Sequence, residues 1–122
     1  MTGDDTSRRL GLTACHKLHT AAEFERARRG RDRHTDALFV VQCSQNDVGT
    51  ARLGMAVSTK NAGNSVSRNR IRRLIRESFR MHRLELPALD FLVTARPAAA
   101  SAENRAVFES LAGLWQRVKA KP

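Results

Sequence analysis

The stretch from residue 60 to residue 83 most constrains the fold of this chain, because it combines a helical period with an extreme charge bias. It contains eight lysines and arginines and one acidic residue, Glu77. On a helical wheel of about 100° per residue, one face collects Ile71, Leu74, Ile75, Ser78, Phe79 and His82. Roughly the opposite side collects Asn69, Arg72, Arg73, Arg76, Arg80 and Arg83, with Arg70 apart and Arg68 nearer the apolar edge. The pattern predicts a helix that ends near His82 or Leu84, packs on a sheet and presents arginines outward.

This arginine-rich face lacks the interleaved acidic residues of an ordinary solvated helix. Arginines at i, i+4 and i+8 (Arg72, Arg76 and Arg80) repel one another unless an anion spreads their charge. The whole chain has 22 Lys plus Arg against 12 Asp plus Glu, a net charge of +10, and residues 60–83 supply 8 − 1 = +7 of it. A guanidinium can bind two phosphate oxygens at once. We therefore favour a nucleic-acid partner over a merely solvated face, and expect no membrane attachment because the core needs the helix's apolar side.

Upstream, the residues predict a short helix and an edge strand. Thr20 and Glu23 have the spacing of a capping box, in which each side chain satisfies the other residue's amide. The helix should run to about Arg29 and stop at Gly30, since glycine is the usual left-handed terminator. Residues 31–35 are a candidate edge strand.

Downstream, three apolar segments predict strands. Residues 38–43 and 52–58 are separated by turn-forming residues and should pair as an antiparallel hairpin. Residues 89–95 are a compact apolar run typical of a buried strand. Ser101 is the expected N-cap of a last helix whose apolar residues recur at helical spacing: Val107, Phe108, Leu111, Leu114, Trp115 and Val118. The order α-β-β-α-β-α, with the extra edge strand, indicates an α+β sandwich with helices covering one sheet.

Length and residue usage limit the remaining possibilities. With 122 residues, 41% of them hydrophobic, we expect one domain over 18–119 after a flexible arm at 1–17. No apolar run approaches the ~20 residues of a spanning helix, and the N-terminus lacks the order of a secretory signal, so we expect a cytoplasmic location. Cys15 and Cys43 are too far apart for a zinc ribbon, and the four histidines have no metal-ligand spacing. We find no catalytic constellation and no protein metal site.

Residues 68–80, Arg-Asn-Arg-Ile-Arg-Arg-Leu-Ile-Arg-Glu-Ser-Phe-Arg, resemble the RNR signature of the bacterial ribonuclease P protein component. The similarity continues upstream through residues 52–60, Arg-Leu-Gly-Met-Ala-Val-Ser-Thr-Lys. Shorter similar stretches are residues 23–24, 29–31, 39–41 and 90–97, so that the resemblance covers about residues 18–118 in the family's order.

The resemblance implies an α-β-β-β-α-β-α domain similar to ribosomal protein S5 domain 2. It also implies a left-handed β-α-β crossover around the arginine-rich helix, against a right-handed preference of about 98%. The family's protein joins a large catalytic RNA that removes 5′ leaders from precursor tRNA. The RNA and its Mg²⁺ ions perform this endonuclease reaction, while the protein adds substrate affinity.

The resemblance also implies two separate RNA-binding surfaces. Candidates for contact with the catalytic RNA are Lys60, Asn64, Arg68, Asn69, Arg70, Arg72, Arg73, Arg76 and Arg80. A separate cleft, between the first helix and the sheet, would hold the single-stranded leader. Phe24 and Phe39 match the family's aromatic positions near that cleft, whereas Arg28 and Gln42 stand where aromatic residues are frequent. We therefore expect leader binding here to depend more on charge and hydrogen bonds than on stacking.

Two other functions fit the charge pattern. A structural RNA-binding protein of the ribosomal or assembly type would need the same basic helix without any role in cleavage. A DNA-binding regulator is less consistent with the predicted elements, because no second helix is placed to form a helix-turn-helix with the basic helix. No obligate protein partner is evident.

Overall fold

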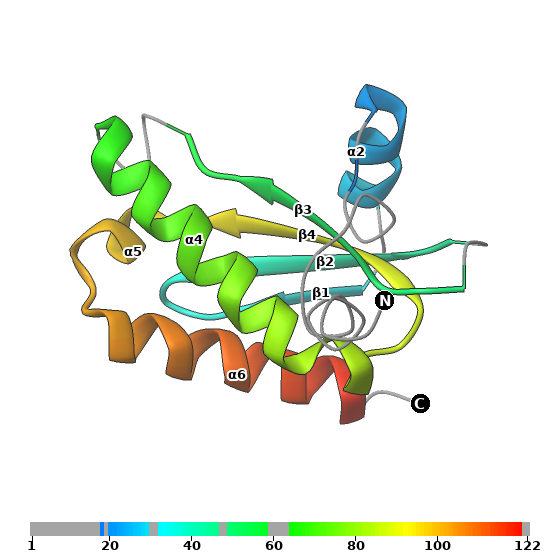
Figure 1. The fold of residues 1–122 in the computed structure, drawn as a ribbon. Coiled ribbons are helices and arrows are strands. Elements are labelled where there is room, and N and C mark those ends of the chain that lie inside the picture. Colours follow the sequence, from blue (N-terminus) through cyan, green and yellow to red (C-terminus); the bar gives the residue numbers. More distant parts are fainter. Residues whose placement is uncertain (1–17, 19, 30–31, 47–48, 59–63, 121–122) are drawn as a thin grey trace, which may run out of the picture.

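The structure is a computed structural model that describes residues 18, 20–29, 32–46, 49–58 and 64–120. Its elements in chain order (Figure 1) are α2 (Ala21–Arg28), β1 (Asp32–Thr35), β2 (Phe39–Gln45), β3 (Arg52–Ala56), α4 (Ser65–His82), the 3₁₀ turn η2 (Arg83–Glu85), β4 (Leu89–Ala95), α5 (Pro97–Ser101) and α6 (Asn104–Ala120). The arm predicted at 1–17, the helix stop at Gly30 and the candidate contact Lys60 lie outside the described residues.

The four strands form one sheet in the order β1-β2-β4-β3. The edge strand predicted after the first helix is present as β1, which pairs antiparallel with β2. The predicted hairpin between the second and third strands is wrong, because β2 pairs antiparallel with β4 and β3 pairs only with β4, in parallel. The physical reason is burial. The apolar run of β4 is buried on both faces and gains most at a central position, which separates β2 from β3.

The connection from β3 through α4 to β4 joins two neighbouring parallel strands. Figure 1 shows α4 in front of the sheet, with β3 and β4 pointing the same way and β4 on the side that makes the crossover left-handed. This confirms the topology implied by the family resemblance and departs from the right-handed rule.

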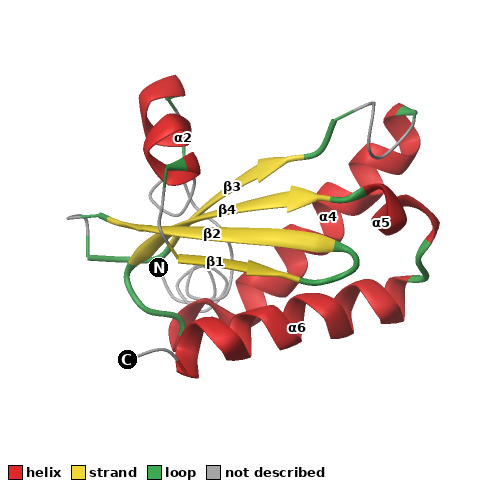
Figure 2. Cartoon of the chain, turned by 180° about the vertical axis from the view of Figure 1, so that it is seen from behind, coloured by secondary structure: helices red, strands yellow, loops and turns green. Residues whose placement is uncertain are grey.

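The sheet separates two apolar clusters. Figures 1 and 2 show α4 and α6 on one face and α2 on the other. Alternate strand residues follow this division: Phe39, Val41 and Cys43 of β2 belong to the large core under α4 and α6, while Leu92 of β4 joins the small cluster under α2. The larger core therefore fixes where α4 sits.

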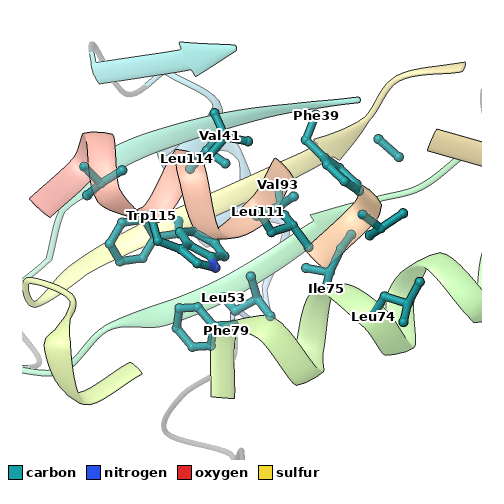
Figure 3. Close-up of a cluster of buried hydrophobic side chains, with 14 of the residues drawn as sticks. Phe39, Val41, Leu53, Leu74, Ile75, Phe79, Val93, Leu111, Leu114 and Trp115 are labelled. Atoms are coloured by element: carbon teal, nitrogen blue, oxygen red, sulfur yellow. The ribbon is translucent and has the colours of Figure 1, made fainter. Parts of the chain in front are cut away.

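An aromatic group anchors α4 and α6 to the sheet in the large core (Figure 3). The rings of Phe79, Phe91 and Trp115 meet edge to face, with centroids 5.9–6.1 Å apart. The indole Nε1 of Trp115 donates a hydrogen bond of 2.9 Å to the Ser78 hydroxyl. Such pairs add stabilisation beyond the buried area, so both helices are held in one orientation.

The apolar face predicted for α4 is confirmed. Ile71, Leu74, Ile75 and Phe79 are all at most 1% exposed. The helix ends at His82, at the earlier of the two predicted positions.

The start predicted for the last helix is wrong. Ser101 closes the short helix α5, which begins with Pro97 at its first position, and α6 starts later at Asn104. Proline is favoured at the first turn of a helix because its missing N–H has no partner there. The predicted apolar positions of α6 are nevertheless buried, with Phe108 half-buried.

Candidate nucleic-acid interface

The cations of α4 differ in exposure more than the helical wheel predicts. Arg73 is exposed, whereas Arg72, Arg76 and Arg80 are half-buried rather than fully exposed. Arg83, assigned to the outward face, is only 7% exposed. Residue 83 follows the last residue of α4 and begins the 3₁₀ turn, so the 100° period of the helical wheel does not extend to it.

Two of the predicted contact residues are engaged within the protein. The Nε of Arg70 donates to the Asn104 side chain at 2.9 Å, and its Nη2 donates to the backbone carbonyl of Ala102. Arg70 therefore ties α4 to the start of α6. Arg80 pairs with Glu77 one turn away on the same helix.

The other arginines of α4 have no ion-pair partner among the described residues. Among the described residues, no carboxylate oxygen lies within 4.0 Å of Arg72, Arg73 or Arg76. Arg68 is half-buried, and its Nε has no hydrogen-bond partner in the described part of the chain. We call these four residues the arginine face; among the described residues, none of them has a carboxylate partner within 4.0 Å.

The start of α4 adds two polar candidates. Asn64 is the exposed N-cap, and its side-chain oxygen accepts a hydrogen bond of 2.9 Å from the Ser67 amide. The side-chain NH₂ group is the part of this exposed residue that can donate a hydrogen bond. Asn69 is exposed one turn later, next to Arg72.

On the opposite face of the sheet, α2 carries the candidate leader residues. Phe24 is half-buried and packs on β3 at Gly54, where an added Cβ would lie 2.8 Å from Phe24 Cε1. Only glycine permits this approach. Gln42 Nε2 donates to the Arg28 backbone carbonyl at 2.9 Å, and the Arg28 guanidinium pairs with Glu25 at 3.0 Å. Phe24, Arg28 and Gln42 therefore lie on the α2 side of the sheet, as predicted.

Phe39 does not lie on the α2 side, and its assignment to that cleft is wrong. Its side chain is 0% exposed and belongs to the large core under α4 and α6. The reason is the alternation of side chains along β2, which sends residues 39, 41 and 43 to one face and residue 42 to the other.

A buried ion-pair network at the α2 end of the sheet was not predicted from the sequence. Arg52 of β3 donates from Nε and Nη2 to both carboxylate oxygens of Asp90 at 2.8 and 2.9 Å, and from Nη1 to Glu23 at 2.8 Å. Asn46 also donates to Asp90, at 2.8 Å. The hydrogen bonding of the Arg52 guanidinium to the Asp90 carboxylate is the main cause that raises the pKa of Arg52 above its usual value. The sequence did offer one sign of this network: Arg52 and Asp90 are charged residues inside otherwise apolar strands.

The same network also positions α2 on the sheet. Glu23 completes the predicted capping box, because its Oε1 accepts from the Thr20 amide while its Oε2 accepts from Arg52. The capping box is thus confirmed, and it anchors the first turn of α2 to the sheet. Phe24 directly follows Glu23, so Arg52 sets where the aromatic ring lies.

A pocket of about 160 Å³ lies at the edge strand β3 and brings the two predicted surfaces together. Its lining comprises Leu18, Phe24, Leu53, Gly54, Met55, Arg72 and Arg76. Residues from both predicted sets therefore line one pocket. At this edge the Leu18 amide donates a hydrogen bond of 3.0 Å to the Leu53 carbonyl of β3, and side chains from α2 and from α4 line the pocket together.

The described residues contain neither a candidate membrane-spanning helix nor a candidate metal cluster. No helix in these ranges combines the length and apolarity that a membrane crossing requires. No group of three or more His, Cys, Asp or Glu residues in the same ranges could hold a metal ion.

Comparison with known proteins places this architecture in a family. The family model described as Ribonuclease P matches residues 12–119. The chain belongs to the ribonuclease P protein family. This confirms the resemblance carried by the RNR-like segment of α4.

Solved structures of the ribonuclease P protein family share the fold. The RNase P protein of Staphylococcus aureus superposes with a TM-score of 0.80 at 32% sequence identity, covering 85% of this chain and 95% of that chain. The RNase P protein of Thermotoga maritima superposes with a TM-score of 0.74 at 26% identity, covering 84% of this chain and 96% of that chain. The α+β architecture predicted from the sequence is therefore confirmed.

Curated relatives match over a shorter region. The ribonuclease P protein components of Escherichia coli O157:H7 (strain EC4115) and Citrobacter koseri are each 49% identical over 72 residues. The match covers 59% of this chain and 60% of each relative, so the chain spans less than two thirds of their length in these comparisons.

Proposed function

We propose that this chain is the protein subunit of ribonuclease P. It binds the catalytic RNA and the 5′ leader of precursor tRNA, and it assists the magnesium-dependent endonucleolytic removal of the leader in the cytoplasm. The observation that carries the proposal is the arginine face on α4, whose Arg72, Arg73 and Arg76 have no carboxylate within 4.0 Å among the described residues. Family membership supplies the identity of the RNA.

In this proposal the protein contributes charge and position. The guanidinium groups neutralise phosphates that would otherwise repel one another where catalytic RNA and substrate meet. The Mg²⁺ ions that supply the hydrolytic chemistry are held by the RNA. The α2 side adds an aromatic ring at Phe24 and hydrogen-bonding groups at Arg28 and Gln42, which suit a single strand with little sequence preference.

Reconstitution tests the proposal directly. Adding the full chain to a bacterial ribonuclease P RNA at low Mg²⁺ should restore cleavage of precursor tRNA, because the added cations replace part of the screening by Mg²⁺. The protein without RNA should give no cleavage. The readout is release of the 5′ leader from end-labelled precursor tRNA.

Two results would contradict the proposal. A structural RNA-binding protein would bind the RNA without restoring cleavage at low Mg²⁺. Magnesium-dependent turnover by a rigorously RNA-free preparation would place the chemistry on the protein instead.

The leader contact makes a second prediction. Changing Phe24 to Ala should weaken binding of leader-bearing tRNA by roughly 1–3 kcal/mol if a base stacks on the ring, while binding of mature tRNA stays nearly unchanged. Comparing the two dissociation constants with the RNA subunit present measures the effect. Arg28→Ala should also weaken the leader-bearing substrate selectively. An equal loss for both tRNAs would show that Phe24 supports the fold rather than the leader.

A further inference from the structure

Side-chain hydrogen bonds attach α4 to α6 at both ends of their contact (Figure 1). Near the end of α4, the indole of Trp115 packs edge to face on Phe79 and donates to the Ser78 hydroxyl at 2.9 Å. About two turns earlier on α4, the guanidinium of Arg70 reaches Asn104, the first residue of α6. A helix held at one point can still roll on its neighbour, whereas two attachments fix its rotation.

The Arg70 contact joins three helices. Its Nε donates to the side-chain oxygen of Asn104 at 2.9 Å, and its Nη2 donates to the backbone carbonyl of Ala102, the C-cap of α5. Both acceptors are carbonyl oxygens, and hydrogen bonds to them from a charged donor are stronger than those between neutral groups. Because the two donors belong to one rigid fork, the contact sets an orientation between α4 and the α5–α6 junction.

Three residues of the arginine face lie between the two attachments. Arg72, Arg73 and Arg76 follow Arg70 and precede Ser78 on the same helix. Since successive residues are about 100° apart around a helix, any roll of α4 would turn all three guanidinium groups together. A change at Arg70 can therefore move cations that it does not touch.

We propose that Arg70 is a positioning residue of the RNA interface. It fixes the rotation of α4 through Asn104 and Ala102, and it meets no phosphate itself. The inference rests on the proposed function, because it concerns how the same arginine face is presented. It also separates Arg70 from Arg73, an exposed arginine of the same helix with no carboxylate within 4.0 Å among the described residues.

Substituting Arg70 distinguishes a positioning role from a phosphate contact. Arg70→Lys keeps the charge and a good helix former, but it lacks the fork that reaches both acceptors. It should weaken binding to a bacterial ribonuclease P RNA by about 2- to 30-fold, the range for a residue that acts on a site without touching the ligand. Arg70→Met should lose a similar amount. In both variants the log–log slope of affinity against salt concentration should equal that of wild type.

Arg73 supplies the matched control on the same helix. Arg73→Met should flatten the salt slope by about one unit, as one lost phosphate contact does, and Arg73→Lys should bind much as wild type because it keeps the charge. If Arg70→Lys also binds as wild type, or if Arg70→Met flattens the slope by a similar amount, Arg70 acts as a phosphate-binding cation and the inference is wrong.

An uncharged partner on another helix gives an independent test. Asn104→Ala removes one acceptor of the Arg70 contact without changing the charge of the protein. It should weaken RNA binding with an unchanged salt slope. Combined with Arg70→Met it should cost clearly less than the product of the two effects, because both changes break the same contact. Its effect should multiply with that of Arg73→Met. Independent multiplication with Arg70→Met as well would overturn the inference.

Amide hydrogen exchange of the free protein guards against general loss of folding. Arg70→Lys should accelerate exchange at residues 68–72 of α4 while the central strand β4 keeps its wild-type protection. Equal acceleration in α4 and β4 would mean global destabilisation and would count against a positioning role. Wild-type RNA binding without restored cleavage would reject the proposed function alone. Restored cleavage together with wild-type affinity of Arg70→Lys would reject only the role of Arg70.

Discussion

Replacing Arg52 by Met should lower the free energy of unfolding by about 3–5 kcal/mol, the cost of breaking a buried ion pair by removing one partner. Asp90 is 0% exposed and would lose both guanidinium hydrogen bonds, while the bond from Asn46 remains. Glu23 would lose its contact with β3 at the same time. Urea denaturation followed by circular dichroism measures the difference.

Arg105→Met is the control for the Arg52 substitution. Its side chain is 86% exposed and pairs at 3.3 Å with Glu109, which is 67% exposed. Exposed pairs of this kind contribute about 0–1 kcal/mol. Similar losses for the two substitutions would mean that the Arg52 network is no stronger than a surface pair.

Arg52 should also affect leader binding beyond its effect on stability. Because it holds Glu23 beside Phe24, a folded Arg52→Met protein should bind leader-bearing tRNA more weakly while its affinity for mature tRNA changes little. Arg52→Lys keeps the positive charge but loses the bidentate contact with Asp90. Its free energy of unfolding should therefore lie between those of wild type and Arg52→Met. A uniform loss for both tRNAs would leave Arg52 with a purely structural role.

Replacing Arg72 and Arg76 together by Ala should flatten the salt dependence of RNA binding by up to about two units of log–log slope. The sequence alone predicts that five to seven cations from Lys60 to Arg83 meet phosphates, with a slope of roughly −4 to −6. The structure lowers this number, since Arg83 is buried and Arg70 and Arg80 have partners within the protein. Four cations on the arginine face give a slope of roughly −3 to −4.

The salt titration, combined with measurements of stability, distinguishes a loss of phosphate contacts from a loss of folding. Alanine is a good helix former, so the double variant should keep its helix content and melting temperature close to those of wild type. Arg105→Ala, which changes a paired arginine on α6, should leave the slope unchanged. An unchanged slope after removal of Arg72 and Arg76 would show that neither side chain meets a phosphate.

Local sequence patterns predicted the helices and most strand positions of this chain. The capping box at Thr20 and Glu23, the apolar face of α4 and the strand at 89–95 all rest on contacts within a few residues or on one repeating period. Where the period changed, as in the 3₁₀ turn at Arg83, the helical wheel placed the side chain wrongly.

The sequence by itself determined that α4 has one buried face, that its charge is strongly positive, and that the chain belongs to the ribonuclease P protein family. Only the tertiary structure decided that β4 separates β2 from β3, that Phe39 faces the core, and that Phe24 lines one pocket with Arg72 and Arg76. The physical reason is how far apart the interacting residues lie along the chain. Periodicity reports which side of a single element avoids water, whereas strand order and the partners of buried charges depend on residues far apart in the chain. Arg52 shows this, because its partners lie 29 and 38 positions away.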